Sequence, residues 1–427
     1  MLPLVARTAT TVEGMGESAE RLPRAAWIAV ACGALVRLAY WLTKFGDPLK
    51  LNDSWYYSGQ ARQLANGVWF RELLHDQPGA EHGPLTSLLM APVSHGDHWQ
   101  DWQRLVTVLT GCVTVWILAR LALAVAGPVV AVVAAFIAAL YPNLWMNDGL
   151  VMSESISMMC VSLSLLLAHR AARERSLPWL AATGAALGLG VLARSEVALL
   201  VPLVAVWLLL ADRSPREHWR GAVLTVAVSA AVVAPWAAFN LSRFENPVLL
   251  TTNDGTTWLG ANCPQTYSGA DIGGWTIECV AADPDYRPDE EPSVRSVRQR
   301  AMARQFVGEA TLGQLSKVAV ARVARTIDLY GLGDLVKQDV GEERPLWAVW
   351  AGIVGFWVLA PLAVLGAVMS RRRTRFLLLA PVVVVLVTTV LFYGAHRIRS
   401  SAEPSLVVLA ASGALVMLQR MRHTDLA

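Results

Sequence analysis

Acidic and basic side chains suited to group transfer recur at several places in the sequence. The stretch "LNDSWYYSGQARQLANG" contains Asp53, and "EHGPL" contains His82. The stretches "MNDGLVMSES", "LARSEV" and "YGAHRIRSSAEP" contain Asp148, Glu154, Arg194, Glu196, Arg397, Arg399 and Glu403. A carboxylate can accept a proton or bind a metal, and a planar guanidinium can hold a phosphate through two parallel hydrogen bonds. The two kinds of side chain are therefore complementary for chemistry on a phosphate-bearing substrate.

Each of these residues also has a purely structural explanation. Asp53 precedes a short polar segment with helical character, so its carboxylate could cap the helix N-terminus. Glu154 could be a first-turn carboxylate that is favoured by the helix dipole. Arg194 and Glu196 could form an ion pair with each other, and His82 could be a turn residue. Arg397 and Arg399 could contact lipid phosphates. The residues alone leave both explanations open.

The elements that must position these side chains are long apolar segments. The chain has 427 residues, of which 55% are hydrophobic and 16% charged, so a single soluble domain would expose apolar surface. Apolar runs of about 20 residues are long enough to cross a bilayer as helices, which pair their own backbone groups. The runs lie near 25–43, 105–126, 129–146, 152–169, 178–193, 196–211, 221–239, 346–369, 376–393 and 404–419. The sequence therefore predicts an all-α membrane protein with about ten transmembrane helices.

Basic residues in the short connections predict the orientation of these helices. The segments "HRAARERS", "DRSPREHWR", "SRRRTRF" and "QRMRH" follow every second apolar run. Lys and Arg in short connections are retained on the cytoplasmic side. We therefore expect both termini to be cytoplasmic and the chain to be a multi-pass protein of the cell membrane.

This topology divides the chain into four parts. Residues 1–24 form a cytoplasmic tail, and residues 25–239 contain the first seven spans together with an outer loop at 44–104. Residues 240–345 form a large extracytoplasmic loop, and residues 346–427 contain the last three spans and a short cytoplasmic C-terminus. The candidate residues all fall on the outer face. Because ionisable groups at membrane depth are costly and usually face a polar cavity, this placement favours one shared site.

The two cysteines of the large outer loop are candidates for a disulfide. Cys263 and Cys279 are sixteen positions apart, and the outer compartment permits oxidation. The alternative is two unpaired thiols in a reducing compartment. Cys32, Cys112 and Cys160 lie in apolar spans and are explained by packing.

The order of these segments resembles membrane glycosyltransferases of the C type. The segments are "NDSWYYSGQARQLANG", "HGPLTSLLMAP", "MSESISMM", "LGLGVLARSEVALLVPL", "APWAAFNLSRFENPVLLTTNDGTTWLGANC" and "HRIRSSAEPSLVVLAA". They are most similar to bacterial relatives of protein O-mannosyltransferases and aminoarabinose transferases, the family 39-like enzymes. Two departures stand out: Ser54 follows Asp53 where many relatives have a second acidic residue, and "HGPL" replaces a motif that often has two prolines.

The resemblance implies an inverting transfer of a hexose or pentose from a polyprenyl-phosphate donor to an extracytoplasmic glycan, lipid or protein. Asp53 corresponds to the catalytic carboxylate, which would act as the general base toward an acceptor hydroxyl. Arg397 or Arg399 would stabilise the leaving phosphate, with Arg194 as a further candidate. The remaining candidates for substrate binding are Tyr56, Tyr57, His82, Asp148, Glu154, Glu196 and Glu403. Metal dependence differs among the relatives, so no cofactor is assigned and a divalent cation remains an option. No nucleic acid partner is expected.

A multi-span transporter or lipid flippase without transfer chemistry is the alternative function. Such proteins also hold charged residues between helices. They commonly have internal repeats and broken helices near the middle of the membrane. No repeat is visible in this sequence, and its polar residues collect at one face. A catalytically inactive scaffold with a large outer loop is also compatible with the sequence.

Overall fold

A computed structural model describes residues 21–50, 53–210 and 215–424, and within these ranges the regular structure is helical. Most of the predicted cytoplasmic tail, 1–24, lies outside the described residues. The described part contains seven helices that are long and apolar enough to cross a membrane. They are α1 (Arg24–Thr43), α4 (Trp99–Ala126), α7 (Glu154–Glu174), α10 (Pro215–Leu241), α17 (Leu346–Met369), α18 (Arg372–Leu391) and α20 (Glu403–Thr424).

Three shorter apolar helices complete the bundle. They are α5 (Pro128–Leu140), α8 (Leu177–Ala193) and α9 (Leu200–Leu210), and the 3-10 turn η4 (Ser195–Leu199) leads into the last of them. Each of the ten predicted apolar runs corresponds to one of these ten helices. The predicted all-α, multi-span fold is therefore confirmed.

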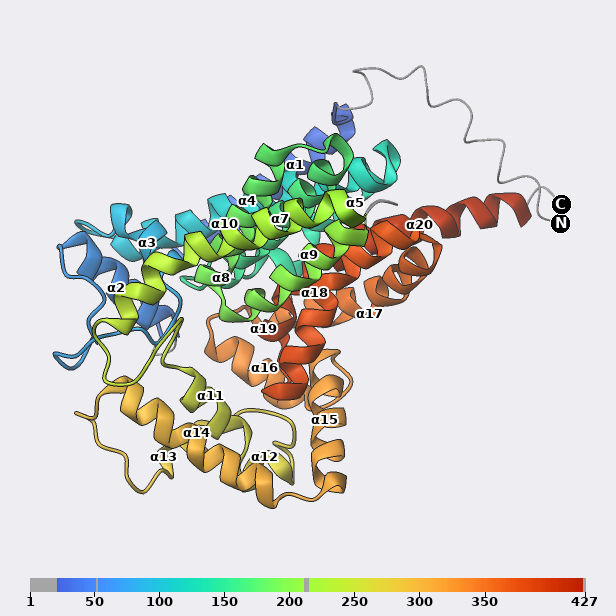
Figure 1. Ribbon diagram of the computed structural model, residues 1–427. Coiled ribbons are helices and arrows are strands. Elements are labelled where there is room, and N and C mark those ends of the chain that lie inside the picture. The colour runs from blue at the N-terminus through green and yellow to red at the C-terminus, as the bar shows by residue number, and fades with distance from the viewer. Residues whose placement is uncertain (1–20, 51–52, 211–214, 425–427) are drawn as a thin grey trace.

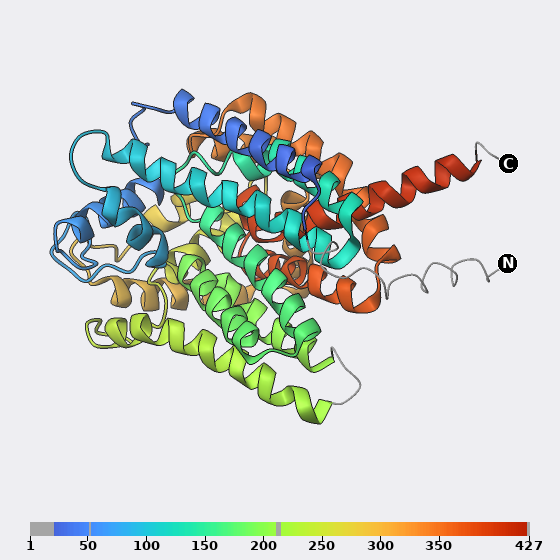
Figure 2. The same ribbon diagram turned by 90° about the horizontal axis from the view of Figure 1, so that it is seen from above.

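The long helices run side by side along the bundle, as Figures 1 and 2 show. The start of α1 and the end of α20 lie at the same end of the bundle, and the helices of the first outer loop lie at the opposite end (Figure 2). Glycines allow close packing within the bundle. A Cβ added at Gly366 of α17 would lie 2.0 Å from the carbonyl oxygen of Leu409 in α20, so only glycine permits this backbone approach.

The first outer loop folds against this opposite end. It contains α2 (Asp53–Ala65), α3 (Leu85–Met90) and the 3-10 turn η3 (Ala91–Val93). Arg243, just after α10, donates hydrogen bonds to the carbonyl oxygens of Phe70 and Gly79 and so ties this loop to the end of the bundle. Between the spans, short helices α6 (Pro142–Trp145) and α19 (His396–Arg399) and the 3-10 turn η5 (Ser400–Ala402) lie near the same end.

The large outer loop forms a small helical layer of its own, drawn in yellow and orange in Figure 1. Its helices are α11 (Asp254–Ala261), α12 (Pro264–Tyr267), α13 (Ile277–Ala281), α14 (Pro292–Glu309), α15 (Leu312–Thr326) and α16 (Leu332–Gly341). A disulfide joins Cys263 to Cys279, with Cα atoms 6.2 Å apart, so the predicted pair is bonded in the structure. Buried Arg322 donates to the carbonyl oxygens of Ala261 and Val390, which ties the layer to the end of α18.

Candidate active site

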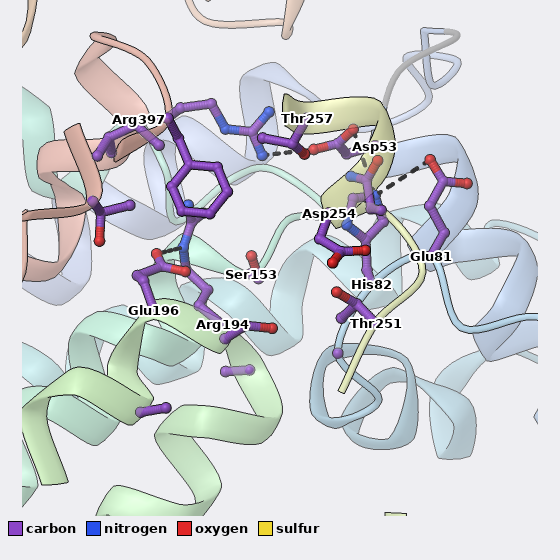
Figure 3. Close-up of a pocket in the computed structure, with 18 of the residues that line it drawn as sticks. Asp53, Glu81, His82, Ser153, Arg194, Glu196, Thr251, Asp254, Thr257 and Arg397 are labelled. Carbon is purple, nitrogen blue, oxygen red and sulfur yellow. Dashed lines mark hydrogen bonds and ion pairs between the residues drawn. The ribbon is translucent and has the colours of Figure 1, made fainter. Parts of the chain in front are cut away.

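A cavity of about 470 Å³ lies where the first outer loop, the large outer loop and the ends of α8 and α18 meet (Figure 3). Six residues from the sequence prediction line it, namely Asp53, Tyr57, His82, Arg194, Glu196 and Arg397. These residues are up to 344 positions apart in the chain. The fold therefore gathers most of the predicted polar residues around one space.

Asp53 is the first residue of α2, and its carboxylate faces the cavity. Its Oδ2 accepts a hydrogen bond from Nη2 of Arg397 at 2.6 Å, and its Oδ1 lies 3.6 Å from Nε2 of His82. Both contacts come from other elements of the chain, α19 and the loop before α3. Burial by itself would raise the pKa of Asp53, but the Arg397 guanidinium and His82 hold that pKa well below its usual range.

Arg397 contacts three carboxylates, one through each of its nitrogen atoms. Nη2 donates to Asp53, Nε donates to Oε1 of Glu154 at 3.2 Å, and Nη1 donates to Oε1 of Glu342 at 2.9 Å. Glu154 is fully buried at the start of α7. The guanidinium is therefore held in a fixed orientation toward the cavity.

Arg194 shares Glu154 with Arg397 but keeps one nitrogen unengaged. Its Nη1 donates to Oε1 of Glu154 at 2.7 Å, and its Nε donates to Glu196. Its Nη2 has no hydrogen-bond partner among the described residues. Arg194 is 10% exposed and lines the cavity, so Nη2 is available to an anion bound there.

His82 lies between two carboxylates and two tyrosine rings. Its ring stacks on Tyr57 at a centroid distance of 4.8 Å and meets the edge of Tyr56 at 5.3 Å. Its Nε2 is 4.0 Å from Oε1 of Glu81 and is buried without a hydrogen-bond partner in the described part of the chain. Tyr56 does not line the cavity; its hydroxyl accepts a hydrogen bond from the backbone N–H of Glu81.

Three predicted residues lie behind the site. Asp148 is buried and accepts a hydrogen bond from Nε of Arg37 at 2.7 Å, which joins α1 to the segment before α7. Arg399 turns away from the cavity and donates to Glu403 at 2.6 Å and to Asp328 at 2.9 Å. The structure therefore places Asp148, Arg399 and Glu403 in ion pairs that support the bundle, and it does not bring them to the cavity.

The prediction from sequence omitted several residues that the structure places at the site. Glu342, which contacts Arg397 and Arg344, lies in the "GEERP" segment just before α17. Asp254, Thr257 and Trp275 of the large outer loop line the cavity opposite the bundle. Glu342 could have been predicted, because it belongs to a run of charged residues directly before an apolar span. No feature of the sequence around Trp275 indicates a site residue.

The donor set of the cavity does not match a typical metal site. Among the described residues, no group of three or more His, Cys, Asp or Glu side chains has the geometry to hold a metal ion. The carboxylates of Asp53, Glu154 and Glu196 each contact an arginine instead.

Comparisons with known proteins give one family match and similar folds. Residues 82–239 match the model of the family "Dolichyl-phosphate-mannose-protein mannosyltransferase". No curated protein sequence shows significant similarity to the chain. The oligosaccharyltransferase AglB from Archaeoglobus fulgidus, solved with an inhibitory peptide and a dolichol-phosphate, has a similar structure, with a TM-score of 0.57 and 15% sequence identity. The similarity covers 94% of this chain and 51% of AglB, so the chain spans about half the length of that protein.

A second similar structure is ArnT from Cupriavidus metallidurans, solved with undecaprenyl phosphate. The TM-score is 0.47 at 16% identity, over 92% of this chain and 78% of ArnT. The family match, together with the fold shared with AglB, confirms the resemblance that the sequence motifs indicated.

Proposed function

On the premise that this chain is a membrane protein with the fold of GT-C type glycosyltransferases, we propose that it transfers a sugar from a polyprenyl-phosphate donor to an acceptor hydroxyl. The transfer takes place on the extracytoplasmic face of the cell membrane. The observation that carries this proposal is the contact between Asp53 and Arg397 at the wall of one cavity. The cavity is large enough for a substrate. At its wall, Asp53 can accept the proton of the acceptor hydroxyl and Arg397 can bind the phosphate of the donor.

Asp53 is the general base. As the acceptor oxygen attacks the anomeric carbon from the face opposite the phosphate, the carbon–oxygen bond to the phosphate breaks with inversion. The proton of the hydroxyl moves to Oδ1 of Asp53, because Oδ2 is occupied by Arg397. The lowered pKa of Asp53 keeps this carboxylate ionised, and therefore ready to accept a proton, throughout the physiological pH range.

Arg194 and Arg397 bind the phosphate of the donor. The unengaged Nη2 of Arg194 is the first contact, and the phosphate then displaces Glu342 from Arg397, which keeps its contact with Asp53. Phosphate oxygens form strong charge-assisted hydrogen bonds with guanidinium groups, so this exchange conserves the ionic contacts of Arg397. The two cations stabilise the negative charge that the lipid phosphate gains as the sugar departs.

The remaining lining residues divide between orientation and acceptor binding. Glu154 holds both arginines in place. Tyr57, which stacks on His82, borders the part of the cavity next to Asp53 where a hexose or pentose ring would lie. Asp254, Thr257 and Trp275 come from the large outer loop, and this loop contributes the acceptor side of the cavity. The acceptor is a glycan, a lipid or a protein of the cell envelope.

Donor turnover by the purified protein tests this proposal. We expect protein reconstituted in lipid to release sugar from radiolabelled polyprenyl-phosphate mannose, glucose or arabinose, with water or added envelope extract as acceptor. Asp53→Asn should reduce this rate by about 10²- to 10⁴-fold, because an amide cannot accept the proton. Binding of undecaprenyl phosphate should persist in this variant.

Three outcomes separate the candidate functions. Consumption of at least one donor by the wild-type protein and its loss in Asp53→Asn support transfer. Movement of intact donor across the vesicle membrane without release of sugar would instead support a flippase. A fully active Asp53→Asn variant would remove Asp53 from the chemistry.

A further inference from the structure

We propose that His82 carries the proton away from Asp53 during each catalytic cycle, an inference that rests on the proposed transfer reaction. His82 does not contact the donor phosphate or the acceptor in this role. It acts through Asp53 and is therefore a positioning and proton-transfer residue.

The free oxygen of Asp53 faces His82. Oδ2 of Asp53 accepts a hydrogen bond from Arg397 at 2.6 Å, which leaves Oδ1 to receive the proton of the acceptor hydroxyl. The closest imidazole nitrogen to that oxygen is Nε2 of His82, at 3.6 Å. This separation is slightly beyond hydrogen-bond length and closes with a small shift of either side chain. Protonation weakens the Asp53–Arg397 ion pair, which favours such a shift.

The imidazole ring is fixed so that Nε2 points between two carboxylates. Tyr57 stacks on one face, Tyr56 meets the ring at its edge, and the hydroxyl of Tyr56 accepts a hydrogen bond from the adjacent backbone N–H of Glu81. The next residue, Gly83, packs directly on the end of α8, where an added Cβ would lie 2.3 Å from the carbonyl oxygen of Leu192. Nε2 itself is buried and has no hydrogen-bond partner among the described residues. A buried imidazole nitrogen without a partner is costly, so a small shift that brings Nε2 within hydrogen-bond distance of Asp53 is favourable.

The proton has a route onward from His82 to solvent. Oε1 of Glu81 lies 4.0 Å from the same nitrogen, Nε2, and the Glu81 side chain is 39% exposed. In this sequence of steps, the O–H bond of the acceptor breaks and Oδ1 of Asp53 gains the proton. The proton then passes to Nε2 of His82 and from there to Glu81 and water. The phosphate leaves with the electron pair of the broken carbon–oxygen bond, so the charges balance.

The charged groups around His82 determine the pH at which this transfer operates. The charged and titratable residues that face or surround the ring are Asp53, Tyr56 and Tyr57 of α2, Glu81 of its own loop, Arg194 and Glu196 beyond α8, and Arg397 of α19. Burial by itself would lower the pKa of His82, but the Asp53 and Glu81 carboxylates raise it above its ordinary value of 6.5. Only neutral imidazole can accept a proton, so the donor turnover rate should rise as pH increases through the pKa of His82.

The pH profile of donor turnover in the full-length reconstituted protein tests the inference. The probe is whichever of the three lipid-phosphate sugars the wild-type protein consumes, with water as the acceptor. His82→Gln retains a polar side chain of similar length but cannot carry a proton. We expect kcat to fall about 10- to 100-fold, less than the loss from Asp53→Asn, and the rise of kcat with pH to disappear. Affinity for undecaprenyl phosphate should stay within about twofold, as Arg194 and Arg397 are unchanged.

Two further variants keep the test independent of folding. His95→Gln changes an exposed histidine of the same outer loop and should retain the wild-type rate and pH profile. In His82→Ala, added imidazole should restore the rate, and small buffers should restore it in the order of their basicity. A structural role for His82 would show no such order.

The outcomes also separate this inference from the proposed function. If wild-type protein consumes donor and Asp53→Asn does not, but His82→Gln keeps the wild-type kcat and pH profile, the relay is wrong and the transferase remains. If no donor is consumed by the wild-type protein, the proposed function fails first.

Discussion

Arg397 and Arg194 differ in how many of their nitrogen atoms are already hydrogen-bonded, and this difference determines their roles. Arg397 contacts Asp53, Glu154 and Glu342, whereas Arg194 contacts Glu154 and Glu196 and retains an unengaged Nη2. A guanidinium with three carboxylate partners is held rigidly, and it must release one of them before it binds a phosphate. At the scale of single residues, Arg397 therefore organises the site, and Arg194 offers the open contact for a phosphate.

Lysine substitutions should separate these two roles. Arg194→Lys should weaken binding of undecaprenyl phosphate by about 1.5 to 3 kcal/mol, because an ammonium group cannot reproduce the planar contact. Arg397→Lys should weaken this binding as well and should in addition lower the thermal stability of the protein, since the lysine ammonium lacks the planar fork that contacts three carboxylates. Lipid-phosphate titration and thermal unfolding in detergent measure the two effects.

A matched control is available on the opposite end of the bundle. Arg170 forms an exposed pair with Glu174, so Arg170→Lys should change neither quantity by more than about 0.5 kcal/mol. Equal loss of lipid-phosphate affinity in Arg170→Lys and Arg194→Lys would contradict the assignment of Arg194.

Elements far apart in the sequence meet the site through close backbone contacts. The loop before α3 carries Glu81 and His82, and it touches the end of α8 at Gly83. The end of α8 leads directly to Arg194 and Glu196. One backbone contact therefore sets the position of Glu81 and His82 relative to Arg194.

Substitution of Gly83 should disturb this contact without changing any charged group. Gly83→Ala would place a Cβ 2.3 Å from the carbonyl oxygen of Leu192, a separation that forces the two segments apart. We expect donor turnover to fall at least about 10-fold and stability to fall by about 1 to 3 kcal/mol. Turnover assays and thermal unfolding check both values.

Gly308→Ala is the corresponding control. Gly308 lies in α14 with no atom within 4 Å of an added Cβ, so alanine should be neutral or stabilise the helix by up to about 1 kcal/mol. Full activity of Gly83→Ala at wild-type stability would show that the loop and α8 move independently.

At the scale of the whole molecule, one end of the bundle carries the candidate site and the other carries the start of α1 and the end of α20 (Figure 2). The layer of α11 to α16 lies beside the bundle (Figure 1), and the site is lined both by ends of the bundle helices and by residues of this layer. The prediction of an extracytoplasmic site now depends on the orientation of this bundle in the membrane.

Labelling of intact cells with a membrane-impermeant thiol reagent tests that orientation. An Arg372→Cys variant should not be labelled, because position 372 lies at the start of α18 at the end predicted to be cytoplasmic. A Ser316→Cys variant should be labelled readily, because Ser316 is exposed on α15 of the outer layer. Cys263 and Cys279 should react only after reduction, because they are joined in a disulfide. The reverse labelling pattern at positions 372 and 316 would place the site in the cytoplasm.

The sequence by itself determined the helices, because the length of an apolar run and the need to pair backbone groups in lipid leave few alternatives. The sequence also indicated that four charged or polar residues lie on the same face of the membrane, because each stands next to an apolar run. These residues are Asp53, His82, Arg194 and Arg397. Their partners could not be predicted in this way. Contacts such as Arg397 with Glu342 join segments 55 positions apart, and contacts such as Arg397 with Asp53 join segments 344 positions apart.

Only the tertiary structure decided which charged residues face the cavity and which support the bundle. Arg397 and Arg399 are two positions apart on one short helix, so their side chains point to different sides, and one meets Asp53 while the other meets Glu403. Asp148 and Glu154 are equally plausible in the sequence, yet the buried Asp148 pairs with Arg37 of α1, whereas the buried Glu154 contacts Arg194 and Arg397, which line the cavity. Such choices depend on the packing of helices that are distant in the chain, and local sequence patterns contain no information about that packing.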